Sequence, residues 1–270
     1  MRSDIDAPYP VGSEQIALFR RDGFIKLKEV LSPQARSVYG AEISRLTIAL
    51  NTPTKPLEER STYDKAFLQV WNLWEHSEVV REFVFGKTLA RIAADLLELD
   101  GVRLYHDQSL YKEASGGITP AHADQYYWPL ASDRTVTAWI PLQSVPMEMG
   151  PLAFYAGSQA FTLGRELGIS DESERQITSL MEAHGFPIVN EPFDLGEVSF
   201  HSGWTFHRAG ANSSRHSRAV MTIIYMDQDM RLKTPDSPAQ IEDWEKWCPG
   251  AVPGEIIRTA KNPLLYTHCK

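Results

Sequence analysis

The sequence has only two cysteines, Cys248 and Cys269, no block of lysines and arginines, and no long apolar run. Two cysteines near one end are too few for a disulfide framework or a thiolate metal site, and they fit a reducing cytoplasm. A net charge of -8 without a basic block disfavours nucleic acids and anionic membranes as partners. Residues 1–6 are polar, unlike a secretory signal, and no stretch is long enough to span a bilayer. We therefore expect a small-molecule ligand.

The length and apolar content are sufficient for one domain with a substantial core. The chain has 270 residues, 43% of them hydrophobic, and shows no internal repeat. Helical signals dominate residues 13–97, where Ser32-Pro33 is typical of a helix start. A strand-like period follows over residues 102–228. The predicted helices are 13–21, 33–50, 77–84 and 87–97, and the predicted strands are 24–27, 102–112, 134–142, 152–155, 198–201 and 218–226.

This order of elements predicts an α+β fold in which flanking helices precede a double-sheet barrel of the jelly-roll type. Residues 161–186 interrupt the strands with a helix that starts near Ser170, and we interpret them as an excursion over the barrel mouth. Whether this excursion acts as a lid is open. The tail, 229–270, carries one predicted helix around 241–247 and then irregular, Pro-containing chain. The sequence leaves the oligomeric state open.

Residues His122 and Asp124 stand two apart in a stretch that we expect to be extended, so their side chains leave the same face. With a second histidine from a distant strand they would form the 2-His-1-carboxylate arrangement, which holds Fe(II) and leaves three coordination positions open. A His-x-Asp triplet alone is common by chance. Two downstream histidines, His201 and His207, have the parity to supply the third ligand, and Arg218 follows His207 by eleven residues.

Several motifs in the same order resemble the phytanoyl-CoA dioxygenase family of iron(II)- and 2-oxoglutarate-dependent oxygenases. The resemblance covers roughly residues 15–228. The matching segments are Tyr105-His106-Asp107-Gln108 with Lys112, then His122 to Pro129, Thr137 to Leu142, Met149 to Leu152 with Gly157-Ser158, and Gly196 to His201. Ala123, Gln159 and Glu197 depart from residues that are frequent in the family, but none of these departures removes a ligand. Asp124 disfavours halogenation, because related halogenating enzymes have a small residue at that position.

The resemblance implies that His122, Asp124 and His207 bind Fe(II), and that 2-oxoglutarate chelates the same ion. His207 is chosen over His201 because only His207 has the downstream arginine. Arg218 would then bind the distal carboxylate of 2-oxoglutarate, since a guanidinium pairs with both carboxylate oxygens and stays charged. His201 would support the strand end or contact a ligand.

Further residues are expected around the cosubstrate and the substrate. The resemblance places Trp139 and Thr119 beside 2-oxoglutarate, together with Gln108, although which of Gln108, Lys112 and His106 contacts it stays open. Lys112 or Arg134 is an alternative anchor for a negative charge on the substrate. The aromatic segment 126–129 is expected to line the mouth of the site, with at least one ring used in core packing.

The predicted activity is hydroxylation of an unactivated carbon of a small-molecule or acyl-type substrate, with release of succinate and CO2. One alternative is a barrel that binds a metal or ligand without turnover, but such a protein needs no guanidinium at Arg218. A zinc hydrolase is the other alternative, since the same ligands hold zinc with an open position. The sequence lacks the His-Glu-x-x-His spacing of metalloproteases, which argues against it.

Overall fold

The computed structural model describes residues 4–51 and 55–268. Cys269 and the first three residues of the polar opening segment lie outside these ranges, as do residues 52–54 of the loop after the second helix. Within the described ranges, no helix combines the length and apolar character needed to cross a membrane.

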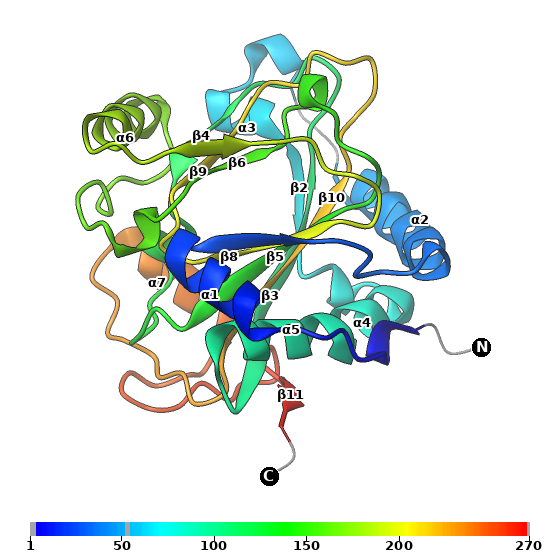
Figure 1. The fold of residues 1–270 in the computed structure, drawn as a ribbon, viewed down its shortest axis with the longest axis vertical. Coiled ribbons are helices and arrows are strands. Elements are labelled where there is room, and N and C mark those ends of the chain that lie inside the picture. The colour runs from blue at the N-terminus through cyan, green and yellow to red at the C-terminus, as the bar shows by residue number, and fades with distance from the viewer. Residues whose placement is uncertain (1–3, 52–54, 269–270) are drawn as a thin grey trace.

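Two antiparallel sheets make up the centre of the molecule. The seven-stranded sheet has the order β1 (Phe24–Leu27), β8 (Val198–Ser202), β5 (Thr135–Pro141), β10 (Val220–Asp227), β3 (Gly101–Tyr111) and β11 (Leu264–Thr267), and β2 (Leu68–Trp71) also pairs with β3. The four-stranded sheet has the order β4 (Thr119–His122), β9 (His207–Ala209), β6 (Leu152–Tyr155) and β7 (Ile188–Asn190). Figure 1 shows the smaller sheet above the larger one. The predicted α+β fold with a jelly-roll barrel is confirmed.

Helices cover the outer face of the large sheet. These are α1 (Ser13–Asp22), α2 (Pro33–Leu50), α4 (Glu78–Val84) and α5 (Lys87–Leu97). Their apolar sides bury Tyr39, Phe83 and Ile92 against outward-facing Ala138 and Ile223 of the sheet. Figure 1 shows α4 and α5 on the side of the large sheet away from the small one. Since every residue of β5 and β10 is buried, the centre of the large sheet is covered on both faces.

Three further helices in the described ranges pack elsewhere: the first two contact β4 of the small sheet, and the third contacts the 3-10 helix that starts at Asp124. They are α3 (Thr62–Ala66), α6 (Asp171–Ala183) and α7 (Pro238–Trp247), and short 3-10 helices occur at Asp4–Asp6, Leu57–Glu59, Leu73–Glu75, Asp124–Tyr127, Met147–Met149 and Ser158–Ala160. Ser170 caps α6 by accepting a hydrogen bond from the Ser173 amide, at the helix start that the sequence predicts. Ser237 caps α7 in the same way, with Pro238 in its first turn.

The predicted helices and long strands agree with the observed ones to within a few residues. The prediction of an irregular chain after α7 is wrong at Leu264–Thr267, which forms β11 on the edge of β3. This strand is short and partly exposed, so it has no alternating apolar pattern, and its pairing depends on the free edge that β3 offers. The sequence also gave no signal for β2, which pairs with the other end of β3.

Candidate metal centre and its cavity

Two strands of the small sheet bring the predicted histidines together. β4 and β9 are antiparallel neighbours, and their register places His122 directly opposite His207. β4 ends at His122, but Ala123 keeps an extended backbone with φ -124° and ψ 132° before the 3-10 helix that starts at Asp124. One extended residue between them returns Asp124 to the face of His122. The parity argument therefore works even though Asp124 lies just beyond the strand.

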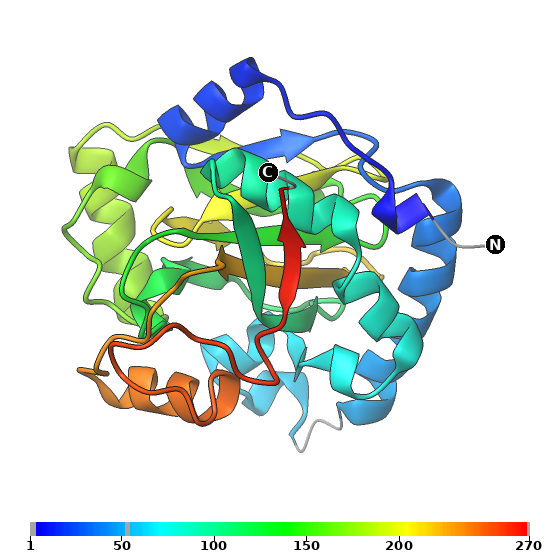
Figure 2. The ribbon, with the colours of Figure 1, turned by 90° about the horizontal axis from the view of Figure 1, so that it is seen from below.

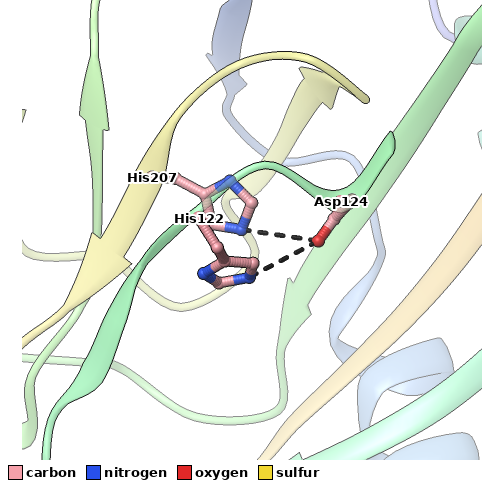
Figure 3. A group of neighbouring side chains, drawn as sticks. All are labelled: His122, Asp124 and His207. Carbon is pink, nitrogen blue, oxygen red and sulfur yellow. Dashed lines mark ion pairs between the residues drawn. The ribbon is translucent and has the colours of Figure 1, made fainter. Parts of the chain in front are cut away.

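The three side chains converge on a common point, as Figure 3 shows. Their ligand atoms all lie within 4.8 Å of one another. Asp124 Oδ1 is 3.6 Å from Nε2 of His122 and 3.7 Å from Nε2 of His207. This is the only group of three or more potential ligands found among residues 4–51 and 55–268.

The tautomers of both imidazoles are fixed by the backbone. His122 Nδ1 lies 2.7 Å from the Pro120 carbonyl oxygen, and His207 Nδ1 lies 2.9 Å from that of Thr205. A carbonyl can only accept, so both Nδ1 atoms carry the proton and both Nε2 lone pairs face Asp124. Neutral imidazoles with free Nε2 atoms are the form in which histidine binds a metal.

The electrostatics of the group favour a neutral imidazole at His207 and an ionised carboxylate at Asp124. Burial lowers the pKa of His207 to about 3, so its ring stays neutral. Burial alone would raise the pKa of Asp124, but the three facing histidines outweigh it and hold that pKa well below its usual range. Thr137 donates a 3.0 Å hydrogen bond to Asp124 Oδ2, which leaves Oδ1 directed at the two Nε2 atoms.

His201 lies beside the group but outside it. It projects from β8 of the large sheet, and its Nε2 is 3.3 Å from Asp124 Oδ2, the oxygen that also accepts from Thr137. His201 Nδ1 is buried and has no hydrogen-bond partner among the described residues. Its position supports the predicted accessory role, in which it holds the orientation of Asp124, and it supports His207 as the third ligand.

The large sheet forms the wall opposite these ligands. Its register aligns Gln108, Thr222 and Trp139 in one row across β3, β10 and β5. All three line a cavity of about 560 Å³ that also reaches Arg218, Thr119 and the three converging side chains. The alternation of the strands thus places this row on the inner face, while its neighbours Ala138 and Ile223 pack against the helices.

Arg218 is a buried cation that faces this cavity. It is 1% exposed, donates one hydrogen bond to the Gly150 carbonyl, and lies with its guanidinium carbon 5.4 Å from the centre of the Trp139 ring. Burial lowers its pKa to about 9, so it remains charged at neutral pH. Its Nε has no hydrogen-bond partner and it forms no ion pair within the described ranges. An unpaired buried guanidinium is costly unless an anionic ligand completes it.

The sequence left open which of Gln108, Lys112 and His106 contacts 2-oxoglutarate. The structure distinguishes Lys112 from the other two. Lys112 does not line the cavity, because its ammonium donates to the carbonyls of Gly117 and Gly210 at 2.6 and 2.7 Å. Burial and the nearby Arg218 lower the pKa of Lys112 to about 6. Gln108 and His106 do line the cavity, and Gln108 Oε1 accepts from Gln69, so its amide NH2 is available to a ligand.

Two further predictions concern charge and aromatic residues. Arg134 pairs with Asp227 outside the cavity, so it does not anchor a ligand there. In the aromatic segment, Tyr127 and Trp128 line the cavity, whereas Tyr126 packs elsewhere, with Gly168 among its neighbours.

Sequence reasoning missed the outer wall of the cavity. It comes from the α3–β2 segment, through Tyr63 and Trp71, and from α7, through Asp243 and Trp247. The rings of Trp71 and Trp247 lie 5.1 Å apart, and Figure 2 shows α7 in orange near the cyan α3–β2 segment. No local pattern marks these residues as cavity residues, because 176 positions separate the two tryptophans in the sequence.

Residues 19–220 match the model of the phytanoyl-CoA dioxygenase (PhyH) family, which is most of the chain. The chain belongs to this family. The match includes every strand of both sheets except β11 and all of β10 after its first residue, and it lies within the range that the sequence motifs indicated.

Known relatives agree with the match. An ectoine dioxygenase of Streptomyces anulatus is 23% identical over 250 residues, covering 85% of this chain and 82% of the relative. The crystal structure of the 2-oxoglutarate (alpha-ketoglutarate)-dependent epimerase SnoN from nogalamycin biosynthesis has a TM-score of 0.73 and 25% identity over 93% of this chain and 97% of that one. EctD from S. alaskensis, solved with 2-oxoglutarate and 5-hydroxyectoine, has a TM-score of 0.70 and 21% identity, covering 96% and 90%.

The chain is thus an iron- and 2-oxoglutarate-dependent oxygenase, as the sequence motifs indicated. The donor set of two histidines and one carboxylate fits ferrous iron with open positions. The unpaired Arg218 beside it fits the free carboxylate of 2-oxoglutarate.

Proposed function

We propose that His122, Asp124 and His207 hold Fe(II), that Arg218 binds the distal carboxylate of 2-oxoglutarate, and that the enzyme hydroxylates a small-molecule substrate. The bound iron and its cosubstrate supply the oxidising chemistry, with succinate and CO2 as by-products. The observation that carries the proposal is the buried guanidinium of Arg218, with its orphaned Nε, in the same cavity as the three potential ligands. Neither a metal-storing barrel nor a zinc hydrolase has a use for such a group.

The residues around Arg218 support the placement of the cosubstrate. Trp139 covers one face of the guanidinium, which restricts a carboxylate to its edge. Thr119 lies at the cavity surface, where its hydroxyl accepts from Lys112 at 3.3 Å and can donate to an anion. The free amide NH2 of Gln108 is a second donor. These groups bind and orient the cosubstrate and keep water away from it.

The substrate would occupy the outer part of the cavity, between the ligands and α7. Its walls are largely aromatic, with Tyr63, Trp71, Tyr127 and Trp247 among them. Of the basic side chains that line the cavity, Arg218 lies at its inner end and Lys246 forms an ion pair with Glu242. A wall without a free cation suits a small organic molecule better than a polyphosphate-bearing acyl-CoA.

The first test is spectroscopic and needs no substrate. Under anaerobic conditions, adding Fe(II) and then 2-oxoglutarate should produce a weak visible charge-transfer band from the chelate. His207→Ala should remove the band, whereas His201→Ala should retain it. Absence of the band in the wild type would favour the metal-binding barrel. Loss of the band in His201→Ala with retention in His207→Ala would show that His201, not His207, is the third ligand. Substrate-dependent release of succinate from metabolite fractions then tests turnover.

We also propose that residues 1–270 act as a single oxygenase domain: a helical part at 13–97, a barrel at 102–228 and a tail at 229–270. The support is that α7 of the tail and α3 of the helical part line the same cavity as the barrel. A cytoplasmic location is supported by the buried free thiol of Cys248, which suits a reducing environment.

A further inference from the structure

A second carboxyl group faces the cavity at the end away from Arg218. Asp243, on α7, lines the cavity and accepts a 3.1 Å hydrogen bond from the Tyr105 hydroxyl through Oδ2. It forms no ion pair among the residues that the structure describes. Lys246, the basic residue one turn along α7, is instead paired with Glu242. The mechanism above gives Asp243 no role.

Aromatic rings surround the cavity next to this carboxyl group. Trp247 lies 5.1 Å from Trp71 and 4.9 Å from His106, measured between ring centres. Burial raises the pKa of Asp243 to about 7, although the hydrogen bonds from Tyr105 and Trp247 oppose this rise. A carboxyl group in such a place favours a ligand that brings its own positive charge, and indole faces attract the same kind of group.

Tyr63 connects this end of the cavity with the metal centre. Its pKa is raised to about 12, first by burial and then by the negative charges of Asp124, Asp64 and Asp243, while a hydrogen bond to Gln69 opposes the rise. Tyr63, Asp124 and Asp243 all line the same cavity. A ligand that fills this cavity of about 560 Å³ can therefore contact Asp243 and present a carbon to the ligand group.

A charge balance singles out Asp243. The charges of Asp124 and Arg218 cancel, and those of a divalent iron and the doubly charged 2-oxoglutarate also cancel. The Glu242–Lys246 pair is neutral as well. The ionised Asp243 is then the remaining charge on the cavity wall without an ion-pair partner among the described residues, although Lys246 is close enough to act on it. Such a half-buried charge is stabilised by a counter-ion.

We propose that Asp243 recognises a protonated amine on the substrate, with the charged nitrogen held between the carboxylate and the indoles of Trp71 and Trp247. The substrate class is thus an amine-bearing small molecule. This inference rests on the proposed function, because it places the substrate between Asp243 and the iron site. It goes beyond that function by naming the group that selects the substrate.

Three probes of nearly equal size test the charge preference: 2-phenylethylamine, 2-phenylethanol and 3-phenylpropionate. Binding to the anaerobic protein loaded with Fe(II) and 2-oxoglutarate is followed by quenching of tryptophan fluorescence and by calorimetry. We expect the amine to bind at least about tenfold more tightly than the alcohol or the acid, the range of a hydrogen bond to a charged group.

Asp243→Asn should abolish this preference, because Asn keeps the size and the acceptor for Tyr105 but loses the charge. The control is Glu245→Gln, an exposed residue on the same helix that makes the same change of charge outside the cavity. It should keep the preference. Thermal melting of each variant checks that it folds.

Amine binding should also depend on pH. The titratable groups that face Asp243 are Tyr105 of β3, Tyr63 of α3, and Glu242, Lys246 and Cys248 at α7. Since the carboxyl group must ionise to pair with the amine, affinity should fall by up to about tenfold per pH unit below about pH 7. Asp243→Asn should remove this dependence.

Equal affinity for the amine and the alcohol would overturn the proposal in favour of a neutral hydroxyl donor. Tighter binding of the acid, an unchanged preference in Asp243→Asn, or no binding of any probe at millimolar concentration would also overturn it. The charge-transfer band of the iron–2-oxoglutarate chelate, recorded in the same samples, separates the two claims. If the band forms without amine preference, only the substrate inference fails, and if the band is absent, the proposed function fails.

Discussion

At the scale of single residues, the cavity depends on charges that burial makes expensive. Arg218 is fully buried beside Trp139 without a carboxylate partner in the described chain, and Lys112 is buried next to it. Asp107 is buried elsewhere in β3, where it accepts a hydrogen bond from the Leu73 amide. Each of these groups is stable only with a specific set of neighbours. Substitutions at such positions therefore give large and interpretable effects.

Replacing Arg218 should affect the cosubstrate far more than the metal. Arg218→Gln keeps a donor for the Gly150 carbonyl but loses the charged pair with the distal carboxylate. We expect the KM for 2-oxoglutarate to rise about ten- to hundredfold, corresponding to about 1.5–3 kcal/mol for hydrogen bonds to a charged group. Anaerobic titration with Fe(II) should be unchanged.

Arg134→Gln is the matched control, since Arg134 pairs with Asp227 outside the cavity. An unchanged KM in Arg218→Gln, or an equal rise in both variants, would contradict the assignment.

Asp107 should make stability depend on pH in the direction opposite to most carboxylates. Burial raises its pKa to about 8, although backbone amides of Leu73 and Trp74 partly oppose this. The folded state then holds a proton that the unfolded state releases above about pH 4. The stability from this proton is complete below about pH 4 and is lost as pH rises through about 8.

Asp107→Asn keeps an acceptor for the Leu73 amide and cannot ionise. Relative to this variant, the wild type should lose at least about 1 kcal/mol of unfolding free energy between about pH 5 and about pH 8. Urea denaturation at both values measures the difference. Asp236→Asn, at an exposed ion pair with Lys233, should show no such divergence. A constant difference between Asp107→Asn and wild type would contradict an uncharged Asp107.

At the scale of elements, α6 holds the two strands that carry the histidines. Glu174 accepts a 2.7 Å hydrogen bond from the Ala121 amide of β4 through Oε2, and its other oxygen pairs with Arg208 of β9. Each contact lies next to a potential metal ligand, because Ala121 precedes His122 and Arg208 follows His207. Glu174 therefore positions both strands without touching the ligands.

Glu174→Ala should lower the affinity for Fe(II) by about tenfold, since two charge-assisted contacts are lost. Glu174→Gln keeps an acceptor for Ala121 and should restore most of the affinity. Glu182→Ala, at the exposed end of the same helix, should have no effect. Anaerobic metal titrations measure all three. If Glu174→Ala lowers the melting temperature but leaves Fe(II) affinity intact, the contact is only structural.

Residues 161–186, which include α6, also contribute to the cavity. Ile169 lines it, and its amide donates a 2.8 Å hydrogen bond to the Tyr127 hydroxyl. The excursion thus lies against the cavity as expected from the sequence. Whether it acts as a lid is a question that the sequence left open.

At the scale of the whole molecule, ligands and cavity link the two sheets. His122 and His207 come from the small sheet, whereas Trp139 and Gln108 come from the large one. A metal and a cosubstrate that bind between the sheets stabilise the folded state by mass action, about 2.7 kcal/mol at a hundredfold excess over Kd. For a chain of this size we expect the melting temperature to rise by about 5–10 °C.

Measured anaerobically, the melting temperature should rise in two steps, first with the metal and then with the cosubstrate. Fe(II) alone should give part of it, and 2-oxoglutarate should add to it only when the metal is present. His207→Ala should show little of either step. A full rise with 2-oxoglutarate in the absence of metal would contradict chelation as the mode of cosubstrate binding.

Much of this protein is determined by local sequence. The change from helical to strand-like periodicity near residue 102 predicted the helical layer and the barrel, because alternation and capping are local signals. The spacing of His122 and Asp124 predicted two ligands on one face, whereas His207 as the third ligand and the role of Arg218 were implied by the resemblance to the phytanoyl-CoA dioxygenase family. These positions lie on or next to strands, where parity fixes the direction of each side chain.

Only the tertiary structure decided the rest. It placed His207 rather than His201 opposite His122, through the pairing of β9 with β4, and it showed that Lys112 is held by backbone carbonyls outside the cavity. It also brought Trp247 and Asp243 of α7 to the outer wall, and it paired β11 with β3. The physical reason is the same in each case: these contacts join segments far apart in the chain, and packing and strand pairing between such segments leave no local pattern in the sequence.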